Sequence, residues 1–254
     1  MEQFNQPSPY VSSVEEVLIT EELARRPTRP PDHQALNRAM TELSAELQTN
    51  RTGMLQLLVR LAMELCHADS AGISILEPSQ GHELFRWHAI AGSFAPNLHG
   101  TIQRDASPCG TVISRNKVLL FREPDRYYAE LRGYEPRTYE ALLVPWHTEG
   151  LATGTLWVLS NDPECRFDGE DARIVQSLAG FASPAYQLIV ALEAAKASQS
   201  DLEDRVAESA FFLAEVLKSL RTDIEARELA ERQYEMPKGF REPIRLVPKR
   251  AASC

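Results

Sequence analysis

From residue 104 to residue 117 the chain reads Arg-Asp-Ala-Ser-Pro-Cys-Gly-Thr-Val-Ile-Ser-Arg-Asn-Lys, and the apolar run Val118 to Phe121 follows. Ser107 before Pro108 predicts a helix N-cap and the first helical residue, because proline lacks the N–H that has no partner at that position. The next backbone N–H groups are then free to face an anion or another acceptor. The stretch predicts a helix that leads into a strand, with the thiol of Cys109 near the helix start.

Two hairpins are predicted on either side of this stretch. Ala71 to Glu77 alternates apolar with small or polar residues, and Leu84 to Ala91 is its return strand after a Pro-Ser-Gln-Gly turn. Glu140 to His147 and Ala152 to Leu159 form the second hairpin. Between the hairpins, the charged and tyrosine-rich segment 124–138 predicts a short helix and a loop over one end of the sheet.

Helical patterns precede and follow the strands. From His33, leucine and methionine residues recur every three or four positions, and a second helix is expected to end near Cys66. Asp168 is a plausible N-cap for a helix that continues to about Gln233. Apolar residues keep a 4-3 spacing over residues 174–220, which predicts a coiled-coil homodimer. Pro184 is expected to kink or restart this helix.

Composition excludes several classes of protein. The 254 residues carry a formal net charge of −9, which argues against general nucleic-acid binding. No apolar run approaches the ~18 residues of a membrane span, and the N-terminus does not resemble a secretory signal. The four cysteines form no C-x-x-C pair, so neither a disulfide framework nor a zinc ribbon is indicated. We expect a cytoplasmic protein with no membrane contact.

Several local sequences, in this order, resemble the GAF domain family. They are Ser70 to Leu76 in the first strand, Arg104 to Gly110 at the middle helix, Leu143-Val144-Pro145 with Gly154 to Val158 in the second hairpin, and Phe167 to Asp171 at the exit helix. The resemblance implies an α+β fold: an antiparallel sheet of five to six strands with helices on one face and a ligand cavity on the other. A long C-terminal coiled-coil helix would follow.

Four segments are expected from these patterns. Residues 1–32 contain five prolines and are predicted to be mostly disordered, and residues 33–192 form the GAF domain. Residues 193–233 form the coiled-coil helix, and 234–254 form a disordered basic tail. The N-terminal part also resembles sensors that place a GAF domain ahead of a histidine kinase, but no kinase or other catalytic domain is recognisable here.

The function expected is regulatory rather than enzymatic. An unknown small molecule would bind in the cavity, and a dimeric helix would carry the signal to a separate histidine kinase or regulator. The residues expected to contact the ligand belong to the middle stretch and to nearby aromatic positions: Arg104, Asp105, Ser107, Cys109, Trp87, Trp146 and Tyr128. The competing interpretation is a scaffold without a ligand, in which the dimer helix and the basic tail are the functional parts.

Cys109 admits further interpretations. It could attach a bilin, as in phytochrome-related GAF domains, although Gly110 stands where those domains place a histidine. It could belong to a methionine-sulfoxide reductase, although Cys66 and Cys165 are poorly placed as resolving partners. It could be a redox-sensing thiolate, because a helix N-terminus lowers the pKa of a thiol. The simplest interpretation is a small, buried and unreactive residue near the helix start, because free cysteines are commonly buried and inert. No cofactor or metal is required by the sequence, and haem or zinc would need ligand spacings that are not present.

Overall fold

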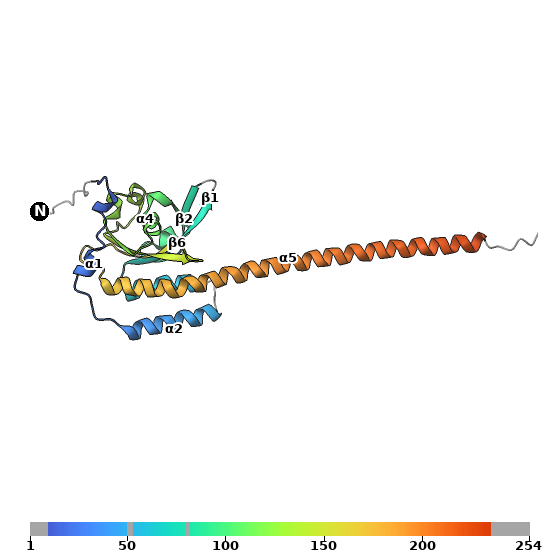
Figure 1. The fold of residues 1–254 in the computed structure, drawn as a ribbon, viewed down its shortest axis with the longest axis horizontal. Helices are drawn as coiled ribbons and strands as arrows, with labels where there is room; N and C mark the ends of the chain where they lie inside the picture. The colour runs from blue at the N-terminus through green and yellow to red at the C-terminus, as the bar shows by residue number, and fades with distance from the viewer. Residues whose placement is uncertain (1–9, 50–52, 80–81, 235–254) are drawn as a thin grey trace, which may run out of the picture. The chain divides into compact units, whose positions relative to one another are not determined.

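The computed structural model describes residues 10–49, 53–79 and 82–234, and contacts divide the chain into two units, residues 1–193 and 194–254. The first unit is built on one antiparallel sheet of six strands (Figure 1). In spatial order the strands are β3 (Thr101–Gln103), β2 (His82–Gly92), β1 (Ser70–Ser79), β6 (Leu151–Ser160), β5 (Glu140–Thr148) and β4 (Leu119–Arg122). Both predicted hairpins are present, and β1 pairs with β6 at the centre of the sheet.

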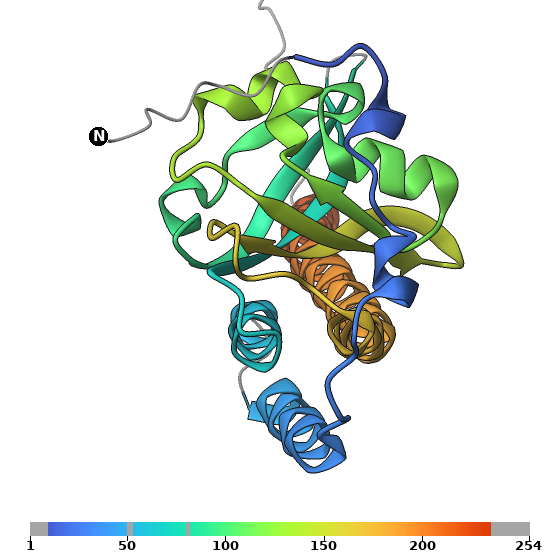
Figure 2. The same ribbon diagram turned by 90° about the vertical axis from the view of Figure 1, so that its left-hand side faces the viewer.

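Helices cover one face of the sheet in two layers (Figure 2). The helices α3 (Met54–Leu65) and the first part of α5 (Gly169–Tyr234) pack on the strands, and α2 (His33–Thr49) lies outside them. Leu142 and Val144 of β5 face this helical side, where they join the core with Leu178 of α5. The sequence thus forms the α+β GAF-like fold expected from its motifs.

The other face of the sheet carries short helices and loops. The helix α4 (Pro108–Arg115) lies here, with the 3-10 helices η2 (Ala95–Asn97), η3 (Arg104–Ala106), η4 (Pro124–Arg126) and η5 (Ala129–Gly133). Ala141 and Leu143, which alternate with the helix-facing residues of β5, belong to a second core on this side. The short strand β3, which pairs with β2, was not predicted.

Residues 10–32 differ from the disordered segment expected and form what we call the N-terminal strap. The strap contains η1 (Val14–Glu16) and α1 (Glu22–Arg25). The N–H of Ile19 donates to the carbonyl of Leu120 at 2.9 Å, and the N–H of Arg122 donates to that of Val17 at 2.8 Å. Val17 is fully buried, so packing and backbone hydrogen bonds offset the conformational entropy that is lost when this proline-rich segment becomes ordered. Residues 1–9 lie outside the described residues.

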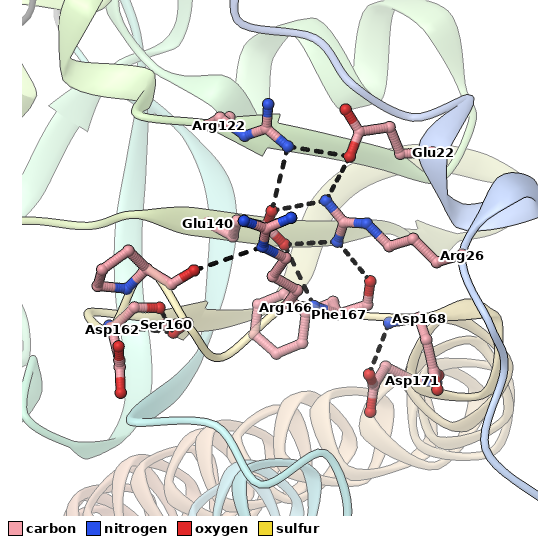
Figure 3. Close-up of polar contacts among 11 residues, drawn as sticks. Glu22, Arg26, Arg122, Glu140, Ser160, Asp162, Arg166, Phe167, Asp168 and Asp171 are labelled. Carbon is pink, nitrogen blue, oxygen red and sulfur yellow. Dashed lines mark hydrogen bonds and ion pairs between the residues drawn. The ribbon is translucent and has the colours of Figure 1, made fainter.

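Arg26 at the end of α1 is the centre of a polar cluster (Figure 3). Its guanidinium contacts Glu22 at 2.6 Å, the carbonyl oxygen of Phe167 at 2.7 Å, and both carboxylate oxygens of Glu140. Arg122 lies 2.9 Å from Glu22 and 3.8 Å from Glu140. Because Glu140 is fully buried at the start of β5, these cations supply the charge that its burial requires.

The helix α5 begins as the sequence predicts. Asp168 is its cap: the carboxylate Oδ1 accepts hydrogen bonds from the N–H groups of Glu170 at 2.8 Å and Asp171 at 3.1 Å. The helix does not restart at Pro184 but continues through it to Tyr234. Beside the proline, Gln187 donates to the carbonyl oxygen of His147 in β5 at 2.9 Å, and Ser183 donates to the same oxygen.

From Ala194 onward α5 belongs to the second unit, and its side chains are exposed as far as they are described. The large apolar ones are Leu202, Val206, Phe211, Phe212, Leu213, Val216, Leu217, Leu220, Ile224 and Leu229. By length and composition alone, α5 also qualifies as a helix that could cross a membrane, a test that core helices of soluble proteins pass as well. The basic tail expected over 234–254 lies almost entirely outside the described residues.

Candidate functional site

A cavity of about 280 Å³ lies on the face of the sheet opposite α3 and α5. The aromatic side chains of its wall include Trp87, Phe94, Tyr134 and Trp157. Trp87 packs edge-to-face on Phe94 and Tyr134, with ring centroids 5.3 Å and 5.4 Å apart, and Phe94 packs edge-on against Trp157 at 5.8 Å. Such contacts stabilise aromatic side chains in one arrangement, so the cavity wall is preformed.

The N-terminus of α4 forms another part of the wall. Ser107 caps the helix, since its hydroxyl accepts from the N–H of Gly110 at 3.4 Å, and Ser107, Pro108 and Cys109 all line the cavity. A Cβ at Gly110 would lie 2.0 Å from the carbonyl oxygen of Arg104. Only glycine therefore allows η3 and α4 to approach so closely, and this approach places the cap at the cavity.

Cys109 is buried in a small hydrogen-bonded cluster. Its sulfur accepts from the hydroxyl of Thr155 at 3.2 Å and lies 3.5 Å from that of Ser74, which accepts from the indole N–H of Trp157 at 2.9 Å. Burial raises the pKa of the Cys109 thiol above its ordinary value, although the hydroxyl of Thr155 opposes the shift. The raised pKa favours the protonated thiol, because the loss of water around the sulfur outweighs the hydrogen bonds that would stabilise a thiolate.

The mouth of the cavity is formed by charged residues of the segment 124–138 and by the N-terminal strap. Arg137 contacts Asp125 through Nε at 2.8 Å. Arg132 donates to the carbonyl oxygen of Asp125 at 2.9 Å and that of Arg126 at 3.4 Å. The guanidinium carbon of Arg132 also lies 3.8 Å from the ring centroid of Tyr10, which is a cation–π contact.

Of the residues predicted to contact a ligand, Trp87, Ser107 and Cys109 line the cavity. Arg104 and Asp105 do not: the guanidinium of Arg104 pairs with Glu83, and Asp105 is exposed in η3.

Two predicted aromatic residues also lie outside the cavity. Trp146 is buried on the opposite, helical face of the sheet and packs on Tyr186 at 5.9 Å. Tyr128 is buried behind α4, where its hydroxyl lies 2.7 Å from that of Thr111. Burial raises its pKa above the ordinary tyrosine value. Neither residue can touch a molecule in the cavity without rearrangement of the core.

The residues predicted to contact a ligand did not include the mouth residues Tyr10, Arg132 and Arg137 or the wall residue Trp157, all of which line the cavity. Tyr10 lies in a segment expected to be disordered, so its position depends on contacts far along the chain. Arg132 and Arg137 lie in the segment 124–138, which was expected to form a short helix and a loop over one end of the sheet and which contains η4 and η5. The expected position of this segment and its several arginines were the features of the sequence from which Arg132 and Arg137 could have been identified.

The contacts of His88 and His147 do not involve Cys109. His88 contacts Glu77 at 2.9 Å and packs near the ring of Tyr186, and His147 contacts the side chain of Asn116 at 2.8 Å. In the part of the chain that the structure describes, no three His, Cys, Asp or Glu side chains are placed to hold a metal ion.

Similar folds occur among solved structures of low sequence identity. The GAF domain of a phosphoenolpyruvate-protein phosphotransferase from Acinetobacter has a TM-score of 0.54 at 18% identity, with 64% of this chain and 97% of that chain covered. The corresponding domain from Coxiella burnetii has a TM-score of 0.51 at 17% identity, with 65% and 99% covered. A methyl-accepting chemotaxis protein segment has a TM-score of 0.51 at 15% identity, with 61% and 99% covered.

The sequence itself gives the family directly. No curated protein sequence matches the chain closely enough to be called a relative. The family model of the GAF domain, however, matches residues 33–186, which is more than half of the chain. The match begins with α2 and includes the sheet, α4 and the first part of α5. The chain therefore belongs to the GAF domain family, whose members are known for ligand binding and signalling.

Proposed function

We propose that this protein is a sensory module that binds a small molecule in the cavity and passes the signal to a partner through paired α5 helices. The observation that carries the proposal is the cavity itself. It is lined mainly by aromatic and aliphatic side chains with a few polar groups at one end and at the mouth, as ligand sites usually are. The segments that frame the cavity, α4 and 124–138, come from different parts of the fold.

The cavity favours a small metabolite over a tetrapyrrole. Its volume of about 280 Å³ lies near the lower limit of the ~300–1,000 Å³ typical of ligand pockets. A bilin or haem is larger than such a space accommodates without displacement of the wall. Cys109 is also poorly suited to covalent attachment, because its sulfur is buried and its pKa is raised by that burial.

Strand β6 gives a route from the cavity to the helices. Trp157 lines the cavity, whereas its neighbours Leu156 and Val158 face the helical core that contains Leu178 of α5. A ligand that shifts β6 therefore changes the surface on which the start of α5 packs. Signalling follows only if the ligand binds the two arrangements with different affinity.

The output proposed is a homodimer through the part of the 174–220 pattern that follows Ala194, read by a separate histidine kinase or regulator in the cytoplasm. The first residues of the pattern, such as Ile174 and Leu178, are buried in the core of the first unit. Supporting this is the 4-3 spacing of apolar residues and the exposure of those that follow Ala194. A second copy of the same helix presents the same stripe, so pairing would bury both.

The test is native mass spectrometry of the full chain purified from its own host, together with sedimentation at micromolar concentration. We expect a dimer that retains a small molecule, which is released on denaturation. A dimer that never retains or binds a small molecule would favour the scaffold alternative and would overturn ligand sensing. A monomer under these conditions would overturn signalling through paired helices.

A further inference from the structure

The charges at the mouth of the cavity are unevenly satisfied. Three arginines and two carboxylates line the cavity: Arg126, Arg132 and Arg137, with Asp125 and Glu135. Arg126 lies 3.8 Å from Glu123, and Arg137 lies 3.3 Å from Glu123 and 2.8 Å from Asp125. Among the described residues, no carboxylate lies within ion-pair distance of Arg132.

Arg132 is nevertheless held in place. Its bonds to two carbonyl oxygens use only part of the guanidinium N–H fork, and the ring of Tyr10 lies under its flat face. Carbonyl oxygens and an aromatic face fix the position of the guanidinium but do not neutralise its charge. The remaining N–H groups are therefore suited to a carboxylate or a similar planar anion, which arginine binds with two parallel hydrogen bonds.

The wall beyond Arg132 favours a flat molecule. Trp87, Tyr134 and Trp157 line the cavity with aromatic rings, and Leu131 of η5 adds an aliphatic side chain next to Arg132. Aromatic walls bind flat rings through offset or edge-to-face contacts that an aliphatic body cannot make as well.

We propose that the cavity binds a small, flat organic anion, with its ring between Trp87, Tyr134 and Trp157 and its anionic group on Arg132. Tyr10, which lies outside the residues matched by the family model, closes the mouth over that group. This ligand class rests on the proposed sensing function. It adds to that function a specificity-determining arginine and a contribution from the N-terminal strap.

Benzoate, benzamide and cyclohexanecarboxylate separate charge from flatness, since the three molecules are close in size. Saturation-transfer NMR on the full chain gives the dissociation constant of each. We expect benzoate to bind about tenfold more tightly than benzamide, because a charge-assisted pair is stronger than a neutral hydrogen bond. We also expect benzoate to bind several-fold more tightly than cyclohexanecarboxylate, because of the ring contacts.

Variants assign the effect to Arg132. Arg132→Gln should remove the preference for benzoate over benzamide, and Arg132→Lys should retain part of it. Arg38→Gln is the matched control, because Arg38 is also exposed and bonded to a backbone carbonyl, that of Gln34, at 3.4 Å. Circular dichroism of each variant confirms that it is folded.

Several outcomes overturn the assignment. If benzoate and benzamide bind equally well, the site does not recognise an anionic group. If benzoate and cyclohexanecarboxylate bind equally well, it does not select a flat ring. If Arg132→Gln still prefers benzoate to benzamide, Arg132 does not bind the anionic group. If no probe binds, the proposed ligand class is wrong, and native mass spectrometry then tests the sensing function separately. A small molecule retained from the host leaves the sensing function intact, whereas its absence overturns both.

Discussion

Arg26 and Glu140, which are 114 residues apart in sequence, meet in a bidentate pair: Nη1 lies 2.8 Å from Oε2, and Nη2 lies 2.7 Å from Oε1. The side chain of Glu140 is completely buried, and that of Arg26 is 12% exposed. The buried carboxylate of Glu140 needs a cation as its partner, and Arg26 supplies it. This ion pair thus attaches the N-terminal strap to the first residue of β5.

Replacement of Arg26 by Met should destabilise the protein by about 3–5 kcal/mol, because it leaves the Glu140 carboxylate buried without its main partner. The change in the free energy of unfolding is measured by urea denaturation. Arg25→Met is the control: Arg25 pairs with Glu21 at 2.8 Å, but both side chains are exposed, so a loss within about 1 kcal/mol is expected. Equal losses in the two variants would show that the buried pair does not hold the strap.

Gly110→Ala should destabilise the domain by roughly 1–3 kcal/mol, because the added Cβ would clash with the backbone of Arg104. Unlike a flexible side chain, this backbone cannot move aside by a change of rotamer. The matched change is Gly180→Ala in α5, where a Cβ meets nothing within 4 Å. An alanine at this exposed position of the helix should stabilise the protein by about 0.5–1 kcal/mol. Thermal unfolding followed by circular dichroism compares the two, and shifts of the same sign would contradict the packing described.

Asp171 should make stability depend on pH in an unusual direction. Burial raises its pKa to about 6, even though Arg29 lies 2.7 Å away. Since the folded state then holds this proton more tightly than the unfolded state, the contribution of Asp171 to stability is present below about pH 4 and is lost as the pH rises to about 6. The whole effect is of the order of 3 kcal/mol.

The variant Asp171→Asn does not titrate, so wild type should lose stability relative to it as the pH rises from about 4 to about 6. Denaturation curves at several pH values give this difference. Glu22 and Glu170 change the stability with pH in the opposite direction. Hydrogen bonds from Arg26 and Arg173 lower the pKa of their carboxyls, so the stability that these two residues contribute is lost only as the solution becomes more acidic. A difference between wild type and Asp171→Asn that does not vary with pH would refute the raised pKa.

Cys109 should react slowly with iodoacetamide in the native protein at neutral pH. Its side chain is buried, and its thiol is held protonated by that burial. Mass spectrometry of tryptic peptides should show a rate at least about a hundredfold below that of the same cysteine in urea. Native Cys165, which is partly exposed, serves as the internal comparison. Rapid native alkylation of Cys109 would revive a redox role.

The proposed dimer should depend on the apolar stripe of α5. Leu213→Asp places a carboxylate within the stripe and is expected to give a monomer at micromolar concentration in sedimentation experiments, because an unpaired buried charge is costly. Ala207→Asp introduces the same side chain at an exposed helical position outside the 4-3 pattern, and it should leave the dimer intact. Identical behaviour of the two variants would point to association through another surface.

Local patterns predicted much of the fold because local physics decides those parts. The Ser107-Pro108 cap, the hairpin of β5 and β6 and the Asp168 cap each follow from a few adjacent residues. The faces of the sheet were harder to assign, because both are buried and both carry tryptophan. Trp146 and Trp157 were indistinguishable on that basis, yet Trp157 faces the cavity and Trp146 faces the helices.

The strap could not be predicted because its order comes from distant partners. Val17 and Ile19 acquire theirs only when β4 is formed, and Arg26 requires Glu140. A short proline-rich segment without those partners has too little apolar surface to order itself. The position of Tyr10 at the cavity follows from the same long-range contacts, and it was missed for the same reason.

The backbone bonds between the strap and β4 also concern solubility. β4 is the last strand of the sheet on its side, and the bonds of Ile19 and Arg122 occupy part of its outer edge. An uncovered strand of this kind pairs readily with strands of other molecules. A chain shortened to begin at His33, where the family match starts, would keep every element of the sheet and still expose that edge. We therefore expect the strap to protect the folded domain against aggregation.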